Sequence, residues 1–168
     1  MRIVFIHQPD GPDQVQITRD DGSEARWAAA GGPGLPHDLV HYVVETELNL
    51  KLGLWGLVRA GVELDAVNAG AHDGAELENR DLTQLLQGEA VAGGVTMALL
   101  APELHDMECL AHIWEQCRRS NVAPPEGLFA RVFGRLRERA GERRDEWAAL
   151  APDGTLVVEF PAAVQLSG

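Results

Sequence analysis

Several kinds of residue are scarce in this 168-residue chain, which has two cysteines, one tyrosine and a single lysine, Lys51. Cys109 and Cys117 would lie about 12 Å apart along one helix, too far for a disulfide within it. We therefore expect no disulfide framework and a reducing compartment, most simply the cytoplasm. The use of arginine at every other Lys/Arg position, with abundant alanine and glycine, indicates a GC-rich and bacterial genome.

Long apolar runs are also lacking. The longest uncharged stretch, residues 90–102, is too short to cross a bilayer and contains Gly93-Gly94. The amino terminus MRIVFIHQPD has no extended apolar core, so it does not resemble a signal peptide. We expect no membrane partner.

Positive charge is the minority, with 14 Lys and Arg against 26 Asp and Glu and a formal net charge of -12. Such a surface repels phosphates, so we expect no nucleic-acid partner. The sequence has no P-loop, no dinucleotide-binding fingerprint and no G-x-S-x-G motif, and these absences disfavour the corresponding enzyme classes.

The hydrophobic pattern predicts one α+β domain over residues 1–168. Short β-type runs near the amino terminus are separated by turn-forming residues, and one apolar run near the carboxyl terminus looks suited to a central strand. The expected fold is a small, mostly antiparallel sheet of the amino-terminal strands plus the carboxy-terminal strand, packed against four to five helices. The predicted strands are 2–6, 14–18, 24–29 and 155–160, and the predicted helices are 36–50, 54–60, 81–100, 102–119 and 128–150.

A glycine pair and a proline predict local features of two later helices. Gly93-Gly94 should weaken or kink the helix over 81–100, by about 1 kcal/mol per glycine, or let another backbone approach closely. Pro102 is expected to occupy the first turn of the next helix.

The segment PHDLVHYVVE, residues 36–45, looks most like a chemical site. On a helix His37, His41 and Glu45 fall within roughly 80° of one another, with Asp38 beside them. Two histidines at i and i+4 can share one metal ion and a carboxylate can add a third ligand. We therefore predict that His37, His41 and Glu45 bind zinc or iron, with Asp38 as catalytic base or as a partner of a ligand.

A second stripe lies on the helix predicted after Pro102. Its polar members include His105 and His112, while the opposite side of that helix is apolar. If this stripe faced the first, His105 and His112 would supply further metal ligands.

The five residues from His37 to His41 resemble two family motifs. They are similar to the His-Glu-x-x-His motif of zincin metalloproteases, with Asp38 in place of glutamate, which implies zinc on His37 and His41 and water activation by Asp38. They also resemble the HDxxH of a ubiquinone-biosynthesis family that binds metal with a further glutamate, where this sequence has Gly53.

A third resemblance is to HD-type phosphohydrolases, whose ligands appear in the order His, His-Asp, Asp. His37 or His41, then His72-Asp73, then Asp106 follow this order, which implies a metal-dependent phosphohydrolase. Each resemblance covers only these few residues, so none assigns a family.

The sequence leaves two functions open. One is a small metal-binding protein, including a metal-dependent hydrolase. The other is a non-catalytic interaction or regulatory module, with structural histidines on a solvated helix face. Whether its partner is a small molecule or a protein, and whether it forms a homo-oligomer, stays open.

Overall fold

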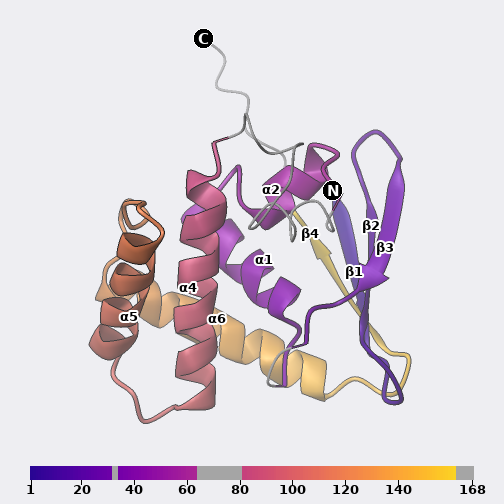
Figure 1. The fold of residues 1–168 in the computed structure, drawn as a ribbon. Helices are drawn as coiled ribbons and strands as arrows, with labels where there is room; N and C mark the ends of the chain where they lie inside the picture. Colours follow the sequence, from indigo (N-terminus) through magenta and orange to yellow (C-terminus); the bar gives the residue numbers. More distant parts are fainter. Residues whose placement is uncertain (32–33, 64–80, 162–168) are drawn as a thin grey trace.

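The protein is described here by a computed structural model that covers residues 1–31, 34–63 and 81–161 (Figure 1). Within these ranges the strands form one antiparallel sheet in the order β3-β2-β1-β4. The sheet carries helices against one face, so the fold is α+β, as predicted. The strands are β1 (Arg2–Ile6), β2 (Gln14–Thr18), β3 (Glu24–Ala28) and β4 (Thr155–Glu159).

The sheet pairs the first strand of the chain with the last described strand. β4 pairs with β1 from Arg2 opposite Glu159 to Ile6 opposite Thr155, which confirms that the carboxy-terminal strand completes the amino-terminal sheet. The expected central position of β4 is wrong, because β1 is its one neighbour in the described sheet. β4 is an edge strand of the described sheet. Its apolar residue Val157 is exposed to solvent.

The alternating pattern of β1 and β2 decides which face of the sheet is buried. Ile3 and Phe5 on β1, with Val15 and Ile17 on β2, have no exposed surface. Successive residues of a strand point to opposite faces, so these four side chains share the face that meets the helices.

The helices stack outward from the sheet (Figure 1). α1 lies between the sheet and α4, α5 packs on the far side of α4, and α6 contacts α1, α4 and α5. The helices are α1 (His37–Leu48), α2 (Leu54–Arg59), α4 (Thr83–Leu100), α5 (Asp106–Arg119) and α6 (Ala130–Ala148). In the part of the chain that the structure describes, no helix is long and apolar enough to cross a membrane.

The start of α5 differs from the prediction. The helix begins at Asp106 rather than Pro102, and His105 is its N-cap. The Glu108 carboxylate accepts the backbone N–H of His105 at 2.9 Å, which fixes the helix start here. The sequence offered Pro102 as the more conventional first-turn residue, but a capping interaction three residues further on determined the boundary.

The glycine pair does not interrupt α4, which is continuous from Thr83 to Leu100. A Cβ at Gly94 would lie 2.4 Å from the Ile113 side chain of α5, whereas a Cβ at Gly93 would meet nothing within 4 Å. Gly94 therefore allows the close approach of α5 that the sequence suggested.

Candidate metal centre

The stripe predicted on α1 is buried rather than solvated. His41 and Glu45 are each 1% exposed, and Asp38 is 3% exposed. α4 covers this part of α1 so closely that a Cβ at Gly88 would lie 3.7 Å from His41 Nδ1. The interpretation of the stripe as a solvated helix face is therefore wrong for these three residues.

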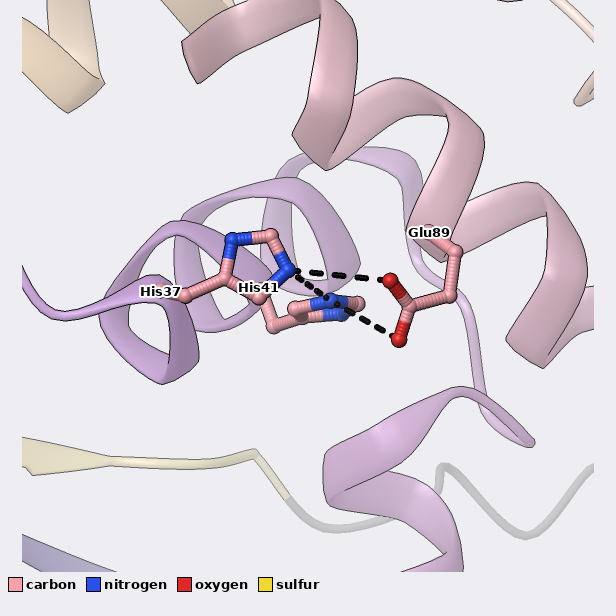
Figure 2. A group of neighbouring side chains, drawn as sticks. All are labelled: His37, His41 and Glu89. Carbon is pink, nitrogen blue, oxygen red and sulfur yellow. Dashed lines mark hydrogen bonds and ion pairs between the residues drawn. The ribbon is translucent and has the colours of Figure 1, made fainter. Parts of the chain in front are cut away.

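Three side chains with metal-binding atoms converge between α1 and α4 (Figure 2). They are His37, His41 and Glu89, and one ligand atom from each lies within 4.8 Å of the others. We call these three residues the His–Glu cluster. His37 and His41 come from successive turns of α1, and Glu89 reaches across from α4 with its carboxylate directed at both rings.

The spacing inside the His–Glu cluster is close to that of a metal coordination shell. His37 Nε2 and His41 Nε2 are 3.2 Å apart. Glu89 Oε2 lies 3.6 Å from His37 Nε2, and Glu89 Oε1 lies 3.4 Å from His41 Nε2. Tetrahedral zinc with ligand bonds of about 2.0–2.1 Å holds its ligand atoms about 3.3–3.4 Å apart. The side chains could therefore receive an ion with small rotations.

Glu45, predicted as a ligand, contacts the opposite ring nitrogen of His41 from the one that Glu89 contacts. Its Oε1 is 3.4 Å from His41 Nδ1, the ring nitrogen that faces away from Glu89. Its Oε2 accepts the backbone N–H of Trp55 at 3.0 Å. A carboxylate in this position fixes the ring orientation and tautomer of a metal-binding histidine.

The backbone of the α1–α2 connection is shaped around the Glu45 carboxylate. A Cβ at Gly53 would lie only 2.4 Å from Glu45 Cδ. Glycine is therefore the residue that lets the chain pass over this carboxylate and begin α2 at Leu54. This contact explains how a short connection encloses a buried acid.

The charges of the cluster depend on one another. Burial by itself would lower the pKa of His41, but the neighbouring carboxylates of Glu45 and Glu89 outweigh it and raise this pKa to about 10. Burial tends to raise the pKa of Glu89, yet hydrogen bonds and charge from His37 and His41 hold it well below its usual range. Burial raises the pKa of Glu45 despite its contact with His41. The two carboxylates therefore favour the protonated form of His41.

Asp38, predicted as the catalytic base, is not a member of the His–Glu cluster and makes its hydrogen bonds elsewhere. Its Oδ2 lies 3.2 Å from Trp27 Nε1 and 3.4 Å from the backbone nitrogen of Ala30, and both donate to it. Its carbonyl oxygen accepts the Trp55 indole N–H at 3.0 Å. Burial raises the pKa of this carboxyl group. Asp38 thus connects α1 to β3 and α2.

The two histidines of the second predicted stripe, His105 and His112, differ in their distance from the His–Glu cluster. His105 is exposed at the N-cap of α5 and is not part of the His–Glu cluster. His112, one turn and a half into α5, lines a pocket that Glu89 also lines. The structure therefore brings His112, but not His105, to the neighbourhood of the cluster.

The residues of the phosphohydrolase resemblance do not assemble among the described residues. His72 and Asp73 lie outside the described ranges. Asp106 is in the first turn of α5, where its carboxylate pairs with Arg137 at 3.1 Å.

Glu89 was not among the ligands predicted from sequence, although the sequence contains a signal for it. It is the one charged residue of α4, an 18-residue helix with an otherwise apolar or uncharged sequence. Its side chain is 52% exposed, and the part that packs against α1 is stabilised by a charged or hydrogen-bonding partner. The histidines of α1 are that partner.

Comparisons with known proteins add no assignment: no family model, no curated protein and no solved structure matches this chain. Among the described residues, the His–Glu cluster is the arrangement that bears on function.

Proposed function

We propose that this protein binds a divalent transition-metal ion, zinc or iron, through His37, His41 and Glu89. The observation that supports this is that the Nε2 atoms of His37 and His41 lie 3.2 Å apart and each lies 3.4–3.6 Å from a different oxygen of the Glu89 carboxylate. The ligand set also suits these metals, because imidazole and carboxylate are common ligands of both. Glu45 would be the acceptor that orients His41.

Three protein ligands leave one tetrahedral position for water. A metal ion lowers the pKa of such a water and produces a nucleophile near neutral pH, which is the basis of metal-dependent hydrolysis. His37 is 31% exposed, so the open position has a route to solvent. The reaction class we propose is therefore hydrolysis, in which an ion held by His37, His41 and Glu89 would activate water.

The direct test is elemental analysis of protein purified without a histidine tag. We expect close to one equivalent of zinc or iron in the wild-type protein. His37→Ala is the most informative variant, because His37 is partly exposed and its loss leaves the buried His41–Glu45 pair intact. Glu89→Gln removes the carboxylate charge while keeping the side-chain shape. Both variants should lose the ion and stay folded.

His105→Ala is the matched control, since it removes an exposed histidine outside the cluster and should keep the metal. Saturation at about 100 times the dissociation constant should stabilise the fold by about 2.7 kcal/mol, or about 5–10 °C in melting temperature for a chain of this size. No metal, with melting unchanged by zinc, iron or chelator, would overturn the proposal.

A second function, the non-catalytic interaction module, has its own observations. The imidazolium of His41 between two carboxylates is a self-satisfied charge cluster that needs no ion. Large apolar side chains are exposed on the helical side, including Leu100, Met107 and Phe129. This function predicts no bound metal, a lower melting temperature for His41→Gln, and a reproducible protein partner in pull-down experiments.

A further inference from the structure

The groove between α4 and α5 contains a pocket that begins at Glu89. Its volume is about 290 Å³, near the lower limit of about 300–1,000 Å³ for small-molecule sites. Because the pocket shares Glu89 with the His–Glu cluster, a molecule bound there lies next to the proposed ion. We call it the α4–α5 pocket.

We propose, on the basis of the metal-dependent function above, that the α4–α5 pocket binds the substrate of the metal centre, a small uncharged molecule with both an apolar part and a hydrogen-bonding group. Its volume is too small for a folded partner or a polymer segment.

The two walls of the pocket differ in character. The α4 wall is one face of that helix and contains residues 86, 89, 90 and 93. Apart from Glu89, these residues are leucine, alanine and glycine. The α5 wall presents His112 and Gln116, followed by Ser120 at the end of the helix. An imidazole, an amide and a hydroxyl can each donate and accept hydrogen bonds, so this wall can bind polar groups of an uncharged ligand.

The pocket lining contains no lysine or arginine among the described residues, and its carboxylate, Glu89, faces the histidines. A substrate carboxylate or phosphate would therefore find no cationic side chain in the pocket. An uncharged molecule with an oxygen directed at the ion, such as an ester or amide, suits both walls and the proposed hydrolysis.

The larger pocket at the start of α5, about 750 Å³, does not compete for this role. Its arginine, Arg137, already donates to the carbonyl oxygens of Leu104 and Pro102 and to Asp106. None of its lining residues belongs to the His–Glu cluster.

Gly93 provides a substitution that fills the α4–α5 pocket and spares the metal ligands. A Cβ there would meet nothing within 4 Å, so Gly93→Leu should be accommodated by the helix and extend into the pocket. Gly141 on α6 is the matched control, since it is also a helical glycine whose Cβ position is free within 4 Å. Gly141→Leu changes helix propensity in the same way without touching the pocket.

The experiment measures binding of hydroxamates to the zinc-loaded protein by calorimetry, with zinc content determined for each sample. Acetohydroxamate supplies the metal-binding group alone, and butyrohydroxamate adds two methylenes that would enter the pocket. Burying a methylene strengthens binding about fourfold, so the two extra methylenes should make the longer compound bind about fifteenfold more tightly to wild type. The gain should vanish in Gly93→Leu and persist in Gly141→Leu, with zinc content unchanged.

The remaining outcomes each overturn a defined part of the reasoning. If zinc is bound but the tail gives no gain, or the gain survives in Gly93→Leu, the pocket is not the substrate site and the metal centre stands. If succinohydroxamate, whose tail ends in a carboxylate, gains as much as butyrohydroxamate, the uncharged substrate class is wrong. If neither zinc nor iron is bound, the proposed function fails and this inference fails with it.

Discussion

The adjacent glycines of α4 should respond oppositely to the same substitution. Replacing either with alanine improves intrinsic helix propensity by about 1 kcal/mol. At Gly93 the new methyl group is free, so we expect the free energy of unfolding to rise by about 0.5–1 kcal/mol. At Gly94 the methyl group would lie 2.4 Å from Ile113 Cγ1 and 2.5 Å from Ile113 Cδ1. The Ile113 side chain has no exposed surface.

Such overpacking costs about 1–3 kcal/mol. Because the propensity gain is common to both variants, Gly94→Ala should be about 1–3 kcal/mol less stable than Gly93→Ala. Urea denaturation followed by circular dichroism measures this difference. In an Ile113→Ala background the obstructing atoms are absent, and Gly94→Ala should then stabilise as Gly93→Ala does. Equal effects of the two alanines in the wild-type background would refute the close approach of α5 to α4, and with it the position of His112 relative to Glu89.

Three further predictions concern the metal centre. Glu45→Gln should weaken zinc affinity about 10–100-fold, the usual effect of losing a carboxylate partner of a ligating histidine, as measured by competition with a chromophoric chelator. Zinc binding should release about one proton at pH 7, because the pKa of His41 is raised to about 10 in the metal-free protein and the ligand must be neutral; apparent affinity should therefore rise with pH below that value, and calorimetric heats should depend on the buffer. Asp38→Asn should retain the metal, since this carboxylate contacts Trp27 and Ala30 instead; loss of the metal with the fold intact would contradict this assignment.

The sequence was informative where the pattern is local. Strand alternation and turn residues located β1, β2 and β3, and the amphipathic spacing located the helices to within a few residues. The pairing of β4 with β1 also followed from the pattern, because a single apolar strand at the carboxyl terminus needs a neighbour. The boundary of α5 was missed because the side chain of Glu108, rather than Pro102, sets the helix start.

The candidate site was only partly accessible from sequence. The i, i+4 spacing of His37 and His41 is a property of one helix, so the sequence by itself determined that their rings could share an ion. Which carboxylate joins them depends on the packing of α4 against α1, and Glu89 is separated from His41 by 48 positions in the chain. Tertiary structure also placed the Trp55 backbone N–H against Glu45 and the Trp27 indole N–H against Asp38, because each buried carboxylate must find hydrogen-bond donors on whichever element covers it. Periodicity determines the face of a helix on which a residue lies, and only the folded chain decides what that face meets.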